Sequence, residues 1–136
     1  MTIDANDLAE TIQATRPMVP AKDFATSKQF YCDLGFQPKM LNEGLAEMSL
    51  GACSFLLQNH YVRDWADNCV IHLYVCDVQP WWARIVAADL ASRYGIKTRA
   101  PHRAEWGATV VHLIDPAGVL WWIHQTESAE IASPLP

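Results

Sequence analysis

The residues with the greatest capacity for chemistry lie in one short segment, from Trp106 to His124. This segment holds three of the chain's six tryptophans and two of its five histidines. Imidazole nitrogens can bind metals or form hydrogen bonds, and indole rings stack on flat molecules. Tryptophan is also large and costly to expose. The segment therefore predicts either an unusual core or an aromatic-lined pocket.

Other common chemistries find little support in the sequence. The chain has no Gly-x-Ser-x-Gly motif and no glycine-rich phosphate loop. Neither Cys53 nor Cys76 has a cationic neighbour in sequence that would activate its thiol. The four cysteines lie among apolar residues without a Cys-x-x-Cys pair, which predicts buried free thiols in a reducing cytoplasm and argues against a zinc site.

The composition is typical of one folded domain spanning residues 1–136. Hydrophobic residues make up 51% of the chain and charged residues 18%, so a sizeable core can form. The net charge of −5 argues against nucleic acid and mildly favours cationic ligands. No apolar stretch reaches the length of a membrane span, and the polar, acidic start is unlike a secretory signal. We therefore expect a cytoplasmic protein with no membrane partner.

The elements that position these residues begin with a predicted β-hairpin. Its apolar strands, at 108–114 and 119–125, flank an Asp-Pro-Ala-Gly turn at 115–118. Proline fixes φ at the second position of such a turn, and glycine accepts the left-handed conformation. The turn is therefore expected to contain four residues.

The same order of elements occurs twice, in a first unit at 15–58 and a second unit at 69–125. In each unit a strand leads into a helix that has Asp at its start and Gly at its end, and three strands follow. The predicted helices are 24–34 and 77–94, and the predicted strands are 15–22, 36–41, 45–50, 52–58, 69–76, 97–103, 108–114 and 119–125. A polar loop at 59–68 joins the units, and terminal extensions lie at 1–14, with a short helix, and at 126–136. The predicted fold class is α+β, with two βαβββ units.

Four motifs are similar to those of the vicinal oxygen chelate superfamily. They are Val-Pro-Ala-Lys-Asp at 19–23, Phe-Tyr-Cys-Asp-Leu-Gly-Phe at 30–36, Trp-Gly at 106–107 and Asp-Pro-Ala-Gly at 115–118. This superfamily includes glyoxalase I, extradiol dioxygenases and the fosfomycin and bleomycin resistance proteins, and the pattern resembles the bleomycin resistance proteins most. The resemblance implies cupped mixed sheets with the helices outside and the ligand inside the cup. It also implies a homodimer.

The resemblance identifies the positions at which metal-dependent members of the superfamily place their ligands. In this chain those positions hold Arg16, Val70, Trp122 and, by comparison of the two units, Phe55. None of these side chains can bind a divalent cation. The chain therefore departs from the metal-dependent members at these positions, and we expect a protein with no metal and no other cofactor.

Strand alternation then decides which aromatic residues face the cup. On the last strand, Trp122 and His124 share one face and Trp121 takes the other. Because Trp122 stands at a metal-ligand position of the superfamily, its face is expected to line the cup, whereas Trp121 belongs to the core. The expected ligand-binding residues are Trp122, Trp106, His72, Tyr74, His112, Phe55, Met18 and His124. The alternative for the tryptophans is plain core packing, and for the histidines it is a hydrogen bond at the pocket rim.

The favoured interpretation is a metal-free protein that sequesters a small aromatic compound, such as an antibiotic and including cationic ones, in a Trp-lined cleft. Stacking and cation–π contacts each contribute about 0.5–2 kcal/mol. One alternative is a divergent metal-dependent enzyme of the glyoxalase or dioxygenase type that uses His72, His112 and His124 as ligands. Another is a member with a filled cup that serves as an interaction module.

Overall fold

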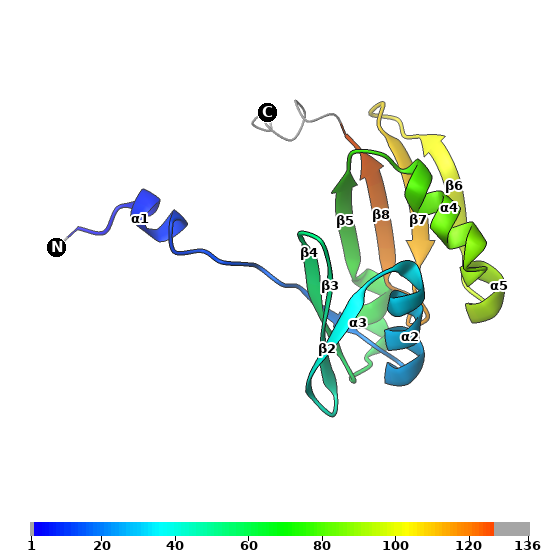
Figure 1. Ribbon diagram of the computed structural model, residues 1–136, viewed down its shortest axis with the longest axis horizontal. Helices are drawn as coiled ribbons and strands as arrows, with labels where there is room; N and C mark the ends of the chain where they lie inside the picture. The colour runs from blue at the N-terminus through cyan, green and yellow to red at the C-terminus, as the bar shows by residue number, and fades with distance from the viewer. Residues whose placement is uncertain (1, 127–136) are drawn as a thin grey trace.

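The computed structural model describes residues 2–126, which form two four-stranded sheets and the helices that accompany them (Figure 1). In chain order the elements are α1 (Ala5–Ala9), β1 (Met18–Pro20), α2 (Phe24–Leu34), β2 (Gln37–Asn42), β3 (Leu45–Leu50), β4 (Cys53–Gln58), α3 (Arg63–Asn68), β5 (Val70–Val75), α4 (Gln79–Ala87), α5 (Leu90–Tyr94), β6 (Thr98–Arg103), β7 (Thr109–Ile114) and β8 (Leu120–Gln125). Of the extension expected at 126–136, only Thr126 is described. No helix in this part of the chain is long and apolar enough to cross a membrane.

The N-terminal sheet has the strand order β1-β4-β3-β2, with β1 parallel to β4 and the other neighbours antiparallel. Helix α2 connects β1 to β2 as predicted. The Asp23 carboxylate accepts a hydrogen bond from the Thr26 N–H at 3.1 Å, which satisfies a free donor of the first turn. Gly35 ends the helix with a φ of 129°, a value that favours glycine.

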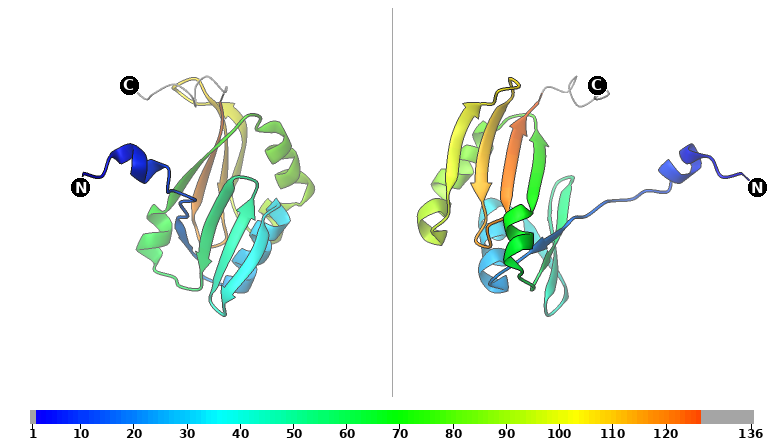
Figure 2. Two further views of the ribbon diagram at one scale, coloured as in Figure 1. Left: turned by 60° about the vertical axis from the view of Figure 1, so that its left-hand side comes forward. Right: turned by 180° about the vertical axis from the view of Figure 1, so that it is seen from behind.

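The C-terminal sheet repeats this arrangement with the order β5-β8-β7-β6 and a parallel β5–β8 pair. Helices α4 and α5 cover one face of the sheet and leave the other face free of helices (Figures 1 and 2). The α+β fold with two βαβββ units, predicted from the sequence, is confirmed.

The core lies between the helices and the covered faces of the two sheets. Tyr31 of α2 is fully buried at its centre, with its ring 4.8 Å from that of Phe55 and 5.8 Å from that of Trp121. Its hydroxyl donates to Asp115 at 2.5 Å and accepts from the indole Nε1 of Trp121 at 2.9 Å. Burial and the adjacent Asp115 raise the pKa of Tyr31 well above its usual value, so the hydroxyl keeps its proton. This network joins a helix of the first unit to the hairpin of the second.

The hairpin turn is organised by the side chain of Asp115. Its carboxylate accepts the N–H of Ala117 at 2.8 Å and that of Val119 at 2.9 Å, in addition to the Tyr31 hydroxyl. Burial raises the pKa of this carboxyl, although the hydrogen bonds oppose that effect. The Gly118 N–H donates to the Asp115 carbonyl at 3.0 Å and Gly118 has a φ of 99°, so the predicted four-residue turn at 115–118 is confirmed. Strand pairing ends at Ile114 and Leu120 on either side of it.

The helices differ from the predictions in three places. The segment expected to be a loop at 59–68 contains α3. The helix expected at 77–94 is divided into α4 and α5 by Asp89, whose φ of 52° cannot continue a right-handed helix. The leading helix expected at 4–14 covers only Ala5–Ala9, although Asp4 caps it as predicted.

The prediction of buried thiols is also wrong. All four cysteines are free, but Cys32, Cys53 and Cys69 are half-buried and Cys76 is exposed. Burial nevertheless raises the pKa of the Cys53 and Cys69 thiols. Both therefore remain protonated at neutral pH, and neither is an activated nucleophile.

Candidate ligand-binding face

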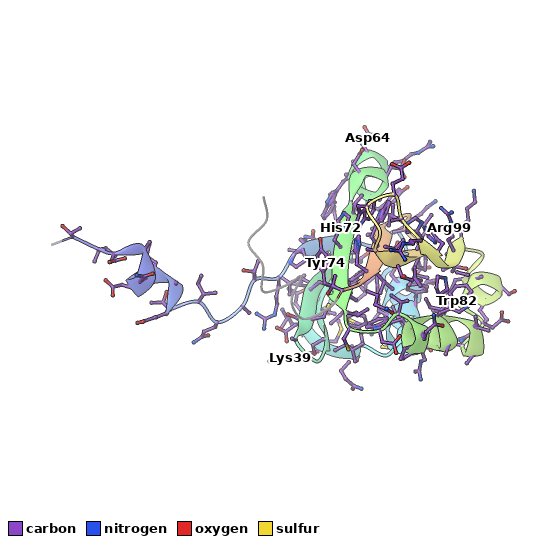
Figure 3. All side chains as sticks on the ribbon, turned by 90° about the horizontal axis from the view of Figure 1, so that it is seen from above. Lys39, Asp64, His72, Tyr74, Trp82 and Arg99 are labelled. Atoms are coloured by element: carbon purple, nitrogen blue, oxygen red, sulfur yellow. The ribbon has the colours of Figure 1, made fainter. Side chains whose placement is uncertain are left out.

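The face of the C-terminal sheet opposite the helices carries aromatic and imidazole side chains. On β8, Trp121 is 2% exposed and belongs to the core, whereas Trp122 and His124 alternate onto the opposite face, as predicted. Figure 3 shows His72 and Tyr74 of β5 on the side of the sheet away from Trp82 of α4. Register and ring contacts bring together what we call the aromatic face: His72, Tyr74, His102, Trp106, His112, Trp122 and His124.

The rings of the aromatic face stack on one another along the parallel β5–β8 pair. The imidazole of His72 lies 5.7 Å from Trp122 and 5.0 Å from His124, centroid to centroid, with interplanar angles of 24° and 23°. Tyr74 stacks on His124 at 4.9 Å. From β7, the ring of His112 meets Trp122 edge-on at 4.2 Å. Five predicted residues therefore form one continuous aromatic surface.

Trp106 extends this surface from the loop between β6 and β7. Its indole lies 5.7 Å from that of Trp122 and 5.8 Å from the imidazole of His124. The residue is 60% exposed, which is unusual for the largest apolar side chain. Trp106 thus presents ring area to solvent beside the rings that the strands hold in place.

His72 and His124 are hydrogen-bonded to each other. The Nδ1 of His72 and the Nε2 of His124 are 2.7 Å apart, so one nitrogen donates and the other accepts. Burial and the neighbouring His72 lower the pKa of His124. The His124 imidazole is therefore neutral at pH 7, and one proton lies between the two rings.

His112 has a different environment within the same face. Its Nε2 is buried and has no hydrogen-bond partner among residues 2–126. Burial, followed by the nearby His102, Arg99 and His124, lowers the pKa of His112. This imidazole is also neutral at pH 7, because a buried nitrogen without a hydrogen-bond partner disfavours the charged form.

Phe55 does not join these residues, so its assignment to the binding site is wrong. It is 1% exposed and packs in the core against Tyr31, Phe36 and Trp121. The register explains the error. Met18 pairs with Leu56 as His72 pairs with Trp122, so Leu56 occupies the position equivalent to Trp122. The sequence comparison aligned Gly51 with Gly118, the glycines of the two hairpins. That alignment is displaced by one residue, so it selected Phe55, whose side chain lies on the opposite face of the sheet.

Met18, the remaining predicted site residue, lies on the other sheet. It is 38% exposed and belongs to what we call the N-terminal face, the surface equivalent to the aromatic face. That face carries Arg16, Met18, Glu47, Ser49, Ser54 and Leu56. The Nε of Arg16 and the Oε1 of Glu47 form an ion pair at 2.8 Å. Within one chain, the structure does not bring Met18 to the aromatic rings.

No protein-family model and no curated protein matches this sequence. Solved structures match its fold. A bleomycin-binding protein in complex with bleomycin has a TM-score of 0.71 at 24% identity, over 85% of this chain and 100% of its own. The bleomycin-binding protein from Streptomyces verticillus, complexed with copper(II)-bleomycin, has a TM-score of 0.72 at 21% identity, over 86% and 98%. Lactoylglutathione lyase from Agrobacterium tumefaciens has a TM-score of 0.61 at 19% identity, over 82% and 92%.

The chain has the fold of these bleomycin-binding proteins and of lactoylglutathione lyase. At the positions for which the sequence resemblance implied metal ligands, the chain has Arg16, Val70, Trp122 and, by register, Leu56 in place of Phe55. None of these side chains donates a lone pair to a divalent metal. Residues 2–126 contain no group of three or more His, Cys, Asp or Glu side chains placed to hold a metal ion. The histidines of the alternative enzyme hypothesis share the aromatic face without forming such a group.

Sequence reasoning missed two residues on this side of the C-terminal sheet. Arg99 pairs with His112 and His102 pairs with Val110, so both lie along the aromatic face. Between them the edge strand β6 has a bulge that contains Pro101, which shifts the register by one residue. Simple alternation would have placed Arg99 and His102 on opposite faces. The proline inside a predicted strand was the available signal.

Proposed function

We propose that this protein binds a small planar aromatic compound on the aromatic face and retains it without chemical change. The observation that carries the proposal is Trp106, which is 60% exposed and 5.7 Å from the indole of Trp122. A flat ligand that covers these rings removes apolar surface from water and gains about 0.5–1.5 kcal/mol for each ring pair. Several such pairs suffice for useful affinity.

The matched structures support a sequestering role. Two of them are bleomycin-binding proteins that were solved with the antibiotic or its copper complex. They show that a protein of this fold can hold such a compound. For this chain we propose an antibiotic or another flat molecule of similar size, on the strength of its own rings.

We propose that binding requires no metal. The residues at the fold's ligand positions include a permanent cation, Arg16, and three side chains without a suitable donor: Val70, Leu56 and Trp122. Trp122 instead supplies ring area at the place where a carboxylate would coordinate a metal. The same substitution thus weakens the enzyme hypothesis and strengthens the binding hypothesis.

A second copy of the chain is proposed to complete the binding cleft. In one chain the aromatic face is a single open wall, on which Tyr74 is 57% and Val70 45% exposed. Clustered apolar surface of this kind marks an interface or a ligand site. Sedimentation velocity should show a dimer. A monomer at the concentrations where ligand binds would contradict the dimer while leaving the binding proposal in place.

Isothermal titration calorimetry with 2-naphthalenemethanol, a neutral two-ring probe, tests the binding proposal. We expect Trp106→Ala to weaken binding by about fivefold to tenfold, which corresponds to the loss of one stacking contact. Trp81→Phe is the matched control, because Trp81 lies on α4 beside Leu34, Leu50 and Arg84 and not on the aromatic face. Equal affinities for the wild type and both variants would contradict the proposal.

A further inference from the structure

Apart from the phenol of Tyr74, every ionisable side chain of the aromatic face is a cation when it is charged. The groups that line it from all four strands are His72, Tyr74, Arg99, His102, His112 and His124. Among residues 2–126, no carboxylate lies on this face of the sheet. The adjoining loop adds the exposed Glu105, next to Arg103 at the end of β6. A bound cation would therefore find no fixed counter-charge on the sheet itself.

Two carboxylates of neighbouring elements already have partners. Glu47, on the N-terminal face, pairs with Arg16 at 2.8 Å. Asp67 of α3 pairs with Arg63 at 3.4 Å. Using either one for a ligand cation would first require breaking an ion pair. The sequence-based preference for cations came from the net charge of the whole chain and from cation–π contacts. On this face the rings are present, but no carboxylate of the sheet lies beside them.

The bond between His72 and His124 makes the face able to gain positive charge. In the neutral pair, one proton lies between the rings and only one of the two outer nitrogens carries a proton. Adding a proton leaves the 2.7 Å bond in place, makes it charge-assisted, and turns both outer nitrogens into donors. An anion beside the pair would favour this protonated form, because opposite charges a few ångströms apart attract.

We propose, on the basis of the binding function above, that the aromatic face selects flat anions over flat cations of the same ring size. The ligand class is an aromatic acid, such as a carboxylate, sulfonate or phenolate. The rings of Trp106 and Trp122 hold its plane, and the His72–His124 pair takes up one proton as its anionic group binds. Arg99 supplies a charge that is present at every pH.

Because binding an anion is coupled to proton uptake, the affinity for that anion must change with pH in a definite direction. Burial lowers the pKa of His124 and of His112, so these two imidazoles are largely neutral at pH 7 in the free protein. A bound anion raises the pKa of the imidazole that it contacts. Affinity for the anion therefore rises as pH falls through the interval between the bound and free pKa values. Affinity for a cation falls over the same interval, and affinity for a neutral ring is unchanged.

Three naphthalene probes of equal ring size test the inference by calorimetry at pH 8, 7 and 5.5. They are 2-naphthalenesulfonate, 2-naphthalenemethanol and (2-naphthylmethyl)trimethylammonium. We expect the sulfonate to bind more tightly than the ammonium at every pH. Its affinity should rise about tenfold from pH 8 to 5.5, as a bound-state shift of one pKa unit would produce. The neutral alcohol should change by less than about twofold, since its binding is not linked to a proton.

Variants separate the roles of the residues. His72→Gln and His124→Gln should each reduce the pH dependence of sulfonate binding, whereas Arg99→Gln should weaken that binding at every pH without changing the dependence. His60→Gln is the control, because His60 lies beside Trp65 in the loop before α3. Tighter binding of the ammonium at pH 7, or an unchanged pH dependence in both pair variants, would overturn the inference. Failure of the neutral alcohol to bind at any pH would instead count against the binding function itself.

Discussion

The N-terminal face and the aromatic face have the same strand order and pairing, but they carry different chemistry. One presents the Arg16–Glu47 ion pair with Met18, two serines and Leu56, and the other presents seven aromatic or imidazole rings. At equivalent positions Leu56 stands where the second unit has Trp122, and Met18 where it has His72. The repeated fold therefore fixes where side chains point, and their types decide which half can bind a flat ligand.

The two hairpins that end the sheets differ just as clearly. In the first unit, Leu50 pairs with Cys53 across a two-residue turn that needs no side-chain support. In the second unit, five residues lie between the paired Ile114 and Leu120. The buried carboxylate of Asp115 accepts hydrogen bonds from two backbone N–H groups of this connection. The longer turn carries β8 into register with β5 and also ties that hairpin to Tyr31. Stability should therefore depend far more on the second turn than on the first.

Asp115→Ala is expected to cause the largest loss of any change considered. The substitution removes the acceptor for two backbone N–H groups and for the Tyr31 hydroxyl, and all of these lie in a buried region. Unpartnered buried donors cost about 1–3 kcal/mol each before relaxation, so we expect the free energy of unfolding to fall by about 3 kcal/mol. Urea denaturation measures it. Ser49→Ala on β3 is the control and should change stability by less than about 0.5 kcal/mol. Equal effects of the two substitutions would remove the contrast between the turns.

The second-largest expected difference between the two faces is in how substitutions on each face change ligand affinity. Trp122→Leu converts the second unit to the residue of the first, and we expect affinity for 2-naphthalenemethanol to drop about tenfold as the central ring is lost. The reverse change, Leu56→Trp, should alter affinity less than about twofold, because the N-terminal face lacks the neighbouring rings. Calorimetry on both variants makes the comparison. A gain in affinity from Leu56→Trp would show that the ligand also contacts the first sheet.

The sequence predicted the secondary-structure elements of the two units better than it predicted which side chains lie on each face. Local signals such as the Asp23 cap, the Gly35 stop and apolar alternation act within a few residues, so the elements and the orientation of Trp121 and Trp122 were predictable. The face occupied by Phe55 was not, because it depends on the length of a turn and not on alternation alone. The placement of Arg99 and His102 likewise depends on a bulge. Local propensity defines strands, whereas register depends on pairing across the sheet.

The division of the second helix shows the same limit. The Asp77 cap and the Gly95 stop predicted one helix over 77–94, but Asp89 adopts a left-handed conformation between α4 and α5. The break lets the two helices follow the twisted sheet, since each packs on the core through a different residue, Ile85 or Leu90. The helical propensity of the segment does not predict this break, because the break depends on how the helices pack on the core.

Acid should destabilise the protein through the aromatic face. Burial lowers the pKa of His112 and His124 below the value of the unfolded chain, so the unfolded state binds more protons as pH falls. Stability is therefore complete at pH 7.5 and declines toward pH 5. Replacing His112 by Phe keeps a ring against Trp122 and should lessen this decline by less than about 1 kcal/mol, because solvent screens partly exposed charges. Urea denaturation at both pH values tests it, with His60→Gln expected to leave the decline unchanged.

The smallest expected effect is at the ion pair of the N-terminal face. Glu47→Gln removes the charge opposite Arg16, but the Arg16 side chain is 39% and the Glu47 side chain 22% exposed. Ion pairs open to solvent contribute about 0–1 kcal/mol, so the free energy of unfolding should fall by no more than that. Affinity of 2-naphthalenemethanol for the aromatic face should stay within about twofold, since this probe carries no charge and stacks on the other sheet. A larger change in affinity would mean that the N-terminal face of a second copy closes over the ligand. The two faces would then form opposite walls of one site, with the aromatic face of one chain supplying the stacking rings and the N-terminal face of its partner supplying the charged side chains.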